Sequence, residues 1–222
     1  MIRLLMRLAI FAACTAWTTY SSADHIGISK SSFEPHYRIQ QTITWCWASS
    51  AEMVLSYSGI KLPQDAIVSR VRGAPFPGGG SSYEMINSTN GVFPDTDKKP
   101  VVVSGQMVMG APTTAVLYNQ LKHNRPVVLT YQTGPWSGHA VVLVAIDADV
   151  DAHGVNISRF YVFDPFPYRQ QWTAYGPQFV EVPELKYQQL EVTATPMGMQ
   201  LTRSGTIIGT LSGMILIDAA SK

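Results

Sequence analysis

The order of its periodic segments constrains the fold of this 222-residue chain more than any other feature. Apolar side chains recur at helical spacing in three segments, residues 46–58, 63–71 and 113–124. Apolar runs typical of strands follow at 126–132, 138–146 and 160–163, with a short run at 101–103 and closing strands over 206–217. Helices that come first and antiparallel strands that come later predict an α+β domain.

Two further segments are predicted to be irregular. Residues 73–99 are rich in Gly, Pro, Ser and Asp, so we expect a loop with short elements, and 78–82 is its most flexible part. A surface loop is favoured here over a lid that gates substrate. Residues 147–154 read as the turn between two of the strands.

The N-terminus has the layout of a secretory signal peptide. Residues 1–7 contain Arg3 and Arg7 without an acid, residues 8–17 are an apolar run, and small polar residues lead to Ala23. A signal peptide over 1–23 leaves a domain over 24–222 and predicts export to the periplasm or the extracellular space. A membrane anchor is disfavoured because the apolar run is about half of the roughly 20 residues that cross a bilayer. A lipoprotein signal ending at Cys14 is a further alternative.

The charge balance disfavours two classes of partner. The chain has 16 basic and 15 acidic residues and a formal net charge of +1, with no block of like charge. A protein that binds nucleic acid or a membrane surface usually has a basic excess. We therefore expect no nucleic acid partner and, once the signal peptide is removed, no stable membrane insertion.

The cysteine content makes one thiol conspicuous. The chain has two cysteines, and removal of residues 1–23 leaves only Cys46. A lone cysteine in an exported protein forms no internal disulfide, so it is either a buried inert residue or a reactive thiol. Cys46 falls in the first turn of the helix predicted over 46–58, where backbone N–H groups stabilise a thiolate. The alternative is that Cys46 packs as a small apolar residue between two tryptophans.

A histidine and an acid occupy the ends of two predicted strands. His139 stands at the head of the apolar run 138–146, and Asp164 follows the run 160–163 just before a proline. Each has an ordinary explanation, as a hydrogen-bonded histidine at a strand edge and as a turn carboxylate. If the two strands are neighbours, however, Asp164 can accept from one imidazole nitrogen while the other faces Cys46.

The order of these residues resembles the papain-like cysteine peptidases. The resemblance spans residues 39–165 and is carried by Gln40, Cys46-Trp47-Ala48, Gly138-His139-Ala140-Val141-Val142 and Asp164-Pro165. It is greatest to the compact bacterial members, namely the bacteriocin-leader peptidases and the plant-pathogen effector proteases of similar outline. It implies a papain-like fold in which an N-terminal helix carrying the nucleophile packs on a small antiparallel sheet.

The resemblance also implies a role for each residue. Cys46 is the nucleophile, His139 the general base and Asp164 the acid that orients the histidine. Gln40 matches the glutamine of the oxyanion hole, with Gln41 as the alternative if the register differs by one. The implied substrate is a peptide or protein, and the chemistry needs no metal or organic cofactor.

The chain departs from papain in ways that affect its substrates. Ile43 stands where papain has an additional cysteine, and Asp164 where papain has an asparagine. Papain's substrate preferences therefore do not transfer. Other readings of the same residues are an amidase, a transferase to an amine, a secreted effector or toxin with one target, and a non-catalytic binding module.

The remaining titratable residues give weaker signals. The other histidines show no metal-ligand spacing and are expected to be surface or core residues; they are His25, His36, His123 and His153. Asp147, Asp149 and Asp151 alternate, but the glycine and distal glutamate of a calcium loop are missing, so a solvated turn is favoured.

Overall fold

A computed structural model describes residues 23–111 and 113–221 of the chain. Residues 1–22, which hold almost all of the predicted signal peptide, lie outside the described residues. The helices are α1 (Lys30–Phe33), α2 (Cys46–Tyr57), α3 (Gln64–Arg72), α4 (Ser82–Ser88) and α5 (Thr114–Lys122), with 3-10 turns at Glu34–His36 and Pro183–Leu185. The strands are β1 (Asp24–Gly27), β2 (Gly91–Pro94), β3 (Pro100–Met109), β4 (Val127–Gly134), β5 (Ser137–Asp151), β6 (Gly154–Phe163), β7 (Tyr168–Thr173), β8 (Gly176–Glu181), β9 (Tyr187–Thr195), β10 (Gly198–Arg203) and β11 (Thr206–Ser221).

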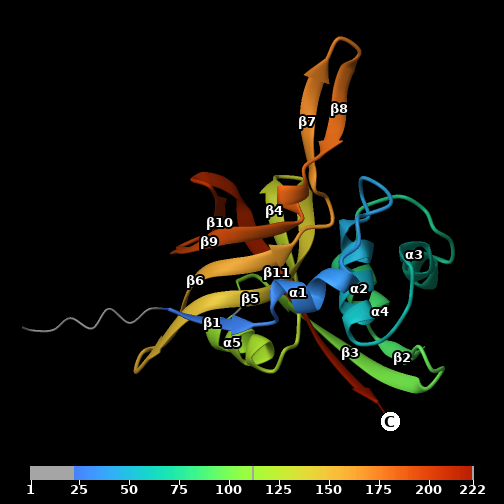
Figure 1. Cartoon of the computed structure of the whole chain (residues 1–222), viewed down its shortest axis with the longest axis horizontal. Coiled ribbons are helices and arrows are strands. Elements are labelled where there is room, and N and C mark those ends of the chain that lie inside the picture. The colour runs from blue at the N-terminus through green and yellow to red at the C-terminus, as the bar shows by residue number, and fades with distance from the viewer. Residues whose placement is uncertain (1–22, 112, 222) are drawn as a thin grey trace, which may run out of the picture.

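Six of the strands close into an antiparallel barrel (Figure 1). The pairing runs from β5 through β6, β9, β10 and β11 to β4, and β4 returns to β5. Three strands extend the sheet outside the barrel, because β1 pairs with β5, β3 with β11, and β2 with β3. Strands β7 and β8 pair only with each other and form a hairpin that stands clear of the barrel (Figure 1).

The expected fold class is therefore wrong. The described residues are mostly β, with 47% strand and 24% helix, rather than a helix on a small sheet. The main reason lies beyond residue 164, where the barrel strands β9 and β10 bury only Gln188, Leu190 and Leu201 and have a weak apolar pattern. The expected turn over 147–154 is also wrong, since β5 continues to Asp151 and β6 begins at Gly154.

The local predictions made before residue 165 agree better with the structure. Helices α2, α3 and α5 lie within one or two residues of the expected segments, and the strands β4, β5 and β6 lie where apolar runs predicted them. The segment 73–99 contains α4 and β2 as its short elements. Helix α4 starts with a capping box in which Ser81 and Glu84 satisfy each other's backbone N–H groups.

Two apolar clusters use opposite faces of the barrel strands. One cluster lies between the helices and the sheet, where Trp47 and Met53 of α2 pack with Val142 and Phe163. The other receives a buried side chain from each of the six barrel strands and from α5, and it includes Leu143 of β5. Because side chains alternate along a strand, β5 can serve both clusters, and its central residues are buried on both faces. Among the described helices, none has the length and apolarity needed to cross a membrane.

Barrel closure between β11 and β4 depends on a glycine. An added Cβ at Gly209 would lie 2.3 Å from the backbone oxygen of Gln132 and 2.6 Å from the ring of Tyr131. We therefore expect Gly209→Ala to destabilise the protein by about 1–3 kcal/mol, because the Gln132 carbonyl oxygen cannot move aside without disturbing the pairing of β4 with β11. Chemical denaturation would measure this against Gly79→Ala, whose added Cβ meets no atom within 4 Å. Equal stability of the two variants would contradict the close approach of Gly209 to strand β4.

Candidate active site

The thiol of Cys46 lies at the first residue of α2, as the sequence predicts. Cys46 is a free, partly exposed cysteine, whereas its neighbours Trp45 and Trp47 are 4% and 2% exposed. The two tryptophans anchor the start of the helix in the core and leave the thiol between them at the surface. The first-turn N–H groups of α2 therefore face the sulfur with positive partial charge.

His139 and Asp164 meet because β5 and β6 are neighbouring strands. His139 is the third residue of β5, and Asp164 directly follows β6. The imidazole Nε2 and Asp164 Oδ1 are 2.7 Å apart, with 17% and 9% of the two side chains exposed. This hydrogen bond occupies Nε2 and leaves Nδ1 available to the thiol.

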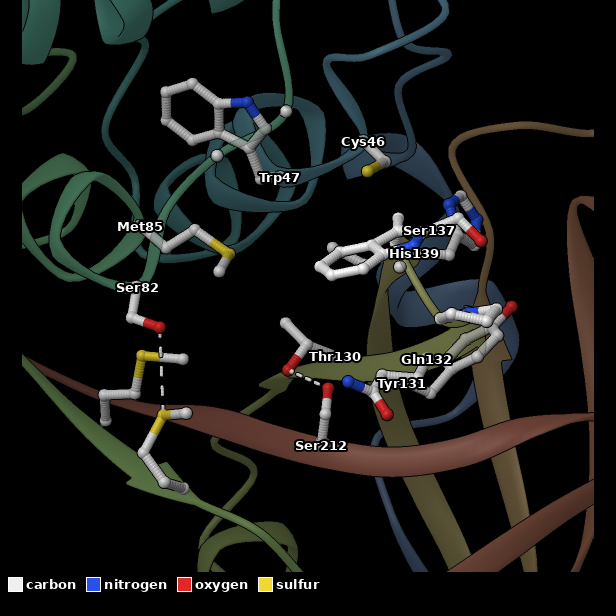
Figure 2. A pocket seen from close by; sticks show the side chains of 18 residues that line it. Cys46, Trp47, Ser82, Met85, Thr130, Tyr131, Gln132, Ser137, His139 and Ser212 are labelled. Atoms are coloured by element: carbon white, nitrogen blue, oxygen red, sulfur yellow. Dashed lines mark hydrogen bonds between the residues drawn. The ribbon is translucent and has the colours of Figure 1, made fainter.

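The thiol and the imidazole line one cavity of about 360 Å³ (Figure 2). Burial alone lowers the pKa of His139, but the Asp164 carboxylate and the Cys46 sulfur both favour the charged ring and together raise this pKa to about 10. Both groups therefore favour the positively charged imidazole. A cation beside the sulfur stabilises the thiolate, which is the nucleophilic form.

The carboxylate of Asp164 is held by more than the histidine. Its Oδ1 also accepts from the backbone N–H of Phe166 at 2.8 Å, and its Oδ2 accepts from Nε2 of Gln188 at 2.8 Å. The Tyr37 hydroxyl donates to the Asp164 carbonyl oxygen at 2.9 Å. Sequence reasoning missed Gln188, since no local pattern marks a residue that contacts the site from β9.

Tyr131 of β4 is a second residue that the sequence reading missed. It lies directly across from His139 in the β4–β5 ladder, and the two rings meet edge to face with centroids 5.6 Å apart. The Tyr131 side chain is 5% exposed, and burial raises the pKa of its hydroxyl. An aromatic ring in this position limits the rotation of the imidazole.

Gln40 lies beside the Asp164 turn but outside the cavity. Its backbone N–H donates to the carbonyl oxygen of Pro165 at 2.9 Å, and its Nε2 donates to the Thr42 carbonyl oxygen at 2.8 Å. Gln40 is 8% exposed, and its Oε1 is buried without a partner among the described residues. Gln41 is exposed, and its backbone N–H donates to Gln64. Of the two, Gln40 is the residue held close to the catalytic candidates, and its oxyanion role stays a prediction.

The cavity wall opposite the thiol is apolar and flexible. Figure 2 shows Met85 on the far side of the cavity from His139, and Met107 and Met109 of β3 also line it. The floor is polar, with the Ser212 hydroxyl donating to Thr130 at 3.2 Å. Methionines adapt to different shapes, so this wall suits an apolar side chain of a bound polypeptide.

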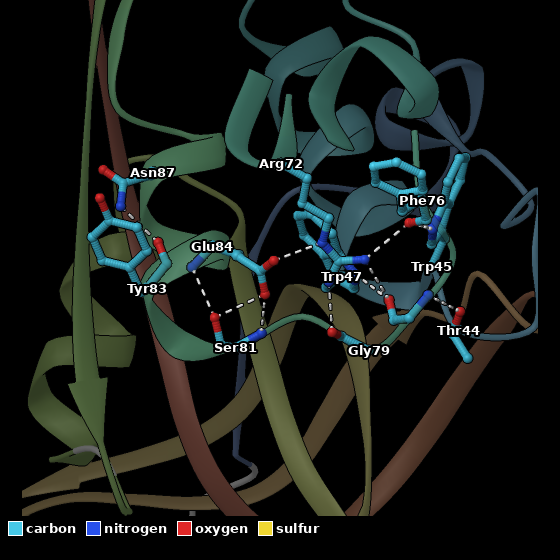
Figure 3. Close-up of polar contacts among 11 residues, drawn as sticks. Thr44, Trp45, Trp47, Arg72, Phe76, Gly79, Ser81, Tyr83, Glu84 and Asn87 are labelled. Carbon is cyan, nitrogen blue, oxygen red and sulfur yellow. Dashed lines mark hydrogen bonds and ion pairs between the residues drawn. The ribbon is translucent and has the colours of Figure 1, made fainter. Parts of the chain in front are cut away.

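The loop over residues 76–80, which packs on Trp47 beside the cavity, is ordered by Arg72 (Figure 3). The guanidinium donates to the carbonyl oxygens of Phe76, Gly78 and Gly79, and its Nε donates to Glu84 at 2.6 Å. The guanidinium also lies over the ring of Trp47, with its carbon 5.2 Å from the ring centroid. The segment that was expected to be most flexible is thus fixed against the helix that carries Cys46.

The alternating aspartates are part of strand β5 rather than a turn. Asp147 accepts from the Tyr161 hydroxyl at 2.8 Å and from Arg159 at 3.2 Å, and it pairs with His25 at 2.9 Å. These contacts fasten β1 to the sheet. Within residues 23–111 and 113–221, no group of three His, Cys, Asp or Glu side chains is placed to hold a metal ion.

The Arg72–Glu84 pair makes the contribution of this loop to folding stability depend on pH. The hydrogen bond from Arg72 is the main cause that lowers the pKa of Glu84 to about 2. A carboxyl whose pKa is lowered on folding stabilises the folded protein fully at pH values above its unfolded pKa of 4.5. This contribution is lost as the pH falls through the folded pKa of about 2.

We therefore expect Arg72→Met to lower the melting temperature by about 3–6 °C at pH 7 and by less at pH 2, where the Glu84 contribution is lost but the hydrogen bonds to Phe76, Gly78 and Gly79 remain. Thermal unfolding followed by circular dichroism at both pH values would measure this. Lys61→Met, at an exposed position, is the matched loss of a cation and should have little effect. A decrease in melting temperature that is the same at pH 7 and at pH 2 would contradict the role given to Glu84.

The charged state of His139 is open to direct measurement. We expect its imidazole to remain protonated at pH 8, and we expect Asp164→Asn to lower its pKa, because burial then opposes the charge with less compensation. Nitrogen-15 NMR of the imidazole across pH 5–11 would follow both. Titration of the wild-type ring near the ordinary value of 6.5 would contradict this reading.

Comparison with known proteins agrees with the chemistry of the site. The model of the Peptidase_C39 like family matches residues 27–194, which include Cys46, His139 and Asp164. A search of curated proteins finds no match. Strands β10 and β11 lie beyond the matched segment. Since the match covers more than half of the chain, the protein belongs to the Peptidase_C39-like family, and this membership supports a hydrolase of the peptidase type.

Proposed function

We propose that this protein is an exported cysteine peptidase that cleaves peptide bonds through Cys46, His139 and Asp164. The observation that carries the proposal is the 2.7 Å hydrogen bond between His139 Nε2 and Asp164 Oδ1, with Cys46 lining the same cavity as the imidazole. The site lies in a chain of a peptidase family. The arrangement meets the needs of covalent catalysis, which are a nucleophile, a base within reach, and a third group that orients the base.

The first half of the reaction forms an acyl-enzyme. The Cys46 thiolate attacks the carbonyl carbon, and the carbonyl oxygen takes the negative charge. The backbone N–H of Cys46 would stabilise that oxyanion, and the Gln40 amide would join it by turning from the Thr42 carbonyl oxygen towards the cavity. The charged His139 then gives its Nδ1 proton to the departing amine as the carbon–nitrogen bond breaks.

The second half releases the acyl group. Neutral His139 accepts a proton from water, and the resulting hydroxide adds to the thioester carbon. The carbon–sulfur bond then breaks, so that the acid product leaves and the thiolate–imidazolium pair is restored. Asp164 retains its negative charge throughout and keeps the same imidazole nitrogen turned away from the thiol.

The proposed place of action is outside the cytoplasm. It rests on the basic, apolar and small-residue order of residues 1–23, with a lipid anchor at Cys14 as the lesser alternative. The proposed substrate is a peptide or protein with an apolar side chain near the cleaved bond, because methionines line one wall of the cavity.

The thiol chemistry can be tested without knowing the substrate. In protein that begins at Asp24, Cys46 is the single cysteine, and we expect iodoacetamide to alkylate it rapidly at pH 6. An ordinary thiol with a pKa of about 8.5 is almost wholly protonated at that pH. His139→Ala should slow alkylation at pH 6 at least roughly tenfold, whereas the exposed His153→Ala should not. Slow alkylation that does not depend on His139 would favour a structural cysteine and a binding module.

Peptide cleavage is the complementary measurement. We expect wild-type protein to cleave members of a diverse peptide library, read by mass spectrometry, and Cys46→Ala to lose at least roughly a thousandfold in rate. Cleavage by Cys46→Ala at the wild-type rate would refute the mechanism. A reactive Cys46 that cleaves only one or a few library members would identify an effector-like narrow specificity.

A further inference from the structure

A buried glutamine supports the side of Asp164 that faces away from the histidine. Gln188 of β9 is 5% exposed, and its Nε2 donates to Asp164 Oδ2 at 2.8 Å. The other carboxylate oxygen receives His139 Nε2 and a backbone N–H. Among the described side chains, Gln188 is thus the donor to Oδ2.

The orientation of the Gln188 amide is determined by two further contacts. Its Nε2 also donates to the Leu185 carbonyl oxygen at 2.7 Å, and its Oε1 accepts from Arg203 Nη1 at 2.9 Å. A flipped amide would turn its oxygen towards Asp164 and Leu185, which are both acceptors, and its NH₂ group towards the guanidinium, which only donates. All three partners therefore select the same orientation.

Arg203 reaches this position because β10 pairs with β9. It is the last residue of β10, which pairs with β9 and lies beyond the segment matched by the family model. The described residues contain no salt bridge from Arg203 to a carboxylate. Arg203 also lines a cavity of about 240 Å³ with His139 and Asp164, so its charge lies close to the pair.

We propose that Gln188 and Arg203 are positioning residues that hold the Asp164 carboxylate directed at His139. The inference rests on the proposed function, because its effect is exerted through the thiolate–imidazolium pair. Arg203 fixes the amide, the amide holds the carboxylate, and the carboxylate holds the charged imidazole beside Cys46. Without the amide donor, Oδ2 of Asp164 loses its hydrogen-bond partner, and a carboxylate that is free to turn stabilises the imidazolium less well.

The test is the rate of iodoacetamide alkylation of Cys46 from pH 4 to pH 9 in protein that begins at Asp24. Gln188→Leu should lower the rate at pH 6 by roughly ten- to a hundredfold and move the acid limb of the profile towards neutral pH. Arg203→Met should move the limb in the same direction by less, and Arg203→Lys, which keeps a cationic donor, should restore most of the wild-type profile. Arg203 is half-buried, so its variants are expected to fold even if Gln188→Leu does not.

Matched controls lie close by in the chain. Gln189→Leu changes the next residue of β9, whose side chain is exposed, and Arg169→Met removes an exposed arginine of β7. Both should keep the wild-type profile. The inference would be overturned if the alkylation rates of Arg203→Met and Gln188→Leu fell at the same acid pH as those of the controls. It would also be overturned if these two variants melted at a lower temperature but kept the wild-type pH profile of alkylation. A wild-type thiol whose alkylation does not depend on His139 would overturn the proposed function together with this inference, whereas a dependence on His139 alone would leave the function standing.

Discussion

Asp164 is a carboxylate with 9% of its side chain exposed, and a charge in such a place is costly to leave without hydrogen-bond donors. Its donors come from three parts of the fold: the imidazole from β5, the amide from β9, and the backbone N–H that follows its own strand. The carbonyl of the same residue receives the Tyr37 hydroxyl from the N-terminal segment. Several elements must therefore be in place before the Asp164 carboxylate has all of its donors. The same arrangement of strands holds His139 at the cavity.

The side of the cavity that carries the thiol is held mainly by side-chain packing, whereas the side that carries Asp164 is held by hydrogen bonds. Cys46 is positioned by the packing of Trp47 under a loop that Arg72 ties together. An added Cβ at Gly80 would lie 2.6 Å from the Trp47 ring, so the loop can approach the indole only where a side chain is absent. The cavity thus lies between a helical wall fixed by packing and a barrel wall fixed by hydrogen bonds.

The sequence was informative where chemistry and local pattern coincide. Cys46 begins a helical period, while His139 and Asp164 stand at the ends of apolar runs that proved to be neighbouring strands, so their proximity could be anticipated. The barrel could not be anticipated, because its strands β9 and β10 bury only Gln188, Leu190 and Leu201 and have a weak apolar pattern. Gln188 and Arg203 reach the site across strand pairings that no local pattern encodes. The alternating aspartates of β5 misled for a related reason: Asp147 binds Tyr161, which lies 14 positions away on the paired strand.

The position of β11 in the chain has a consequence for how the protein acquires its structure. Strand β11 is the last element, yet it pairs with β3, β4 and β10, which are spread over the preceding hundred or so residues. The barrel consequently cannot close until residues 206–221 are available, and pairing between segments so distant in sequence is slow. During synthesis the helical segments emerge first and wait for the strands on which they pack. A chain that is still being made therefore lacks the closed barrel, and its assembly is deferred until β11 has been synthesised.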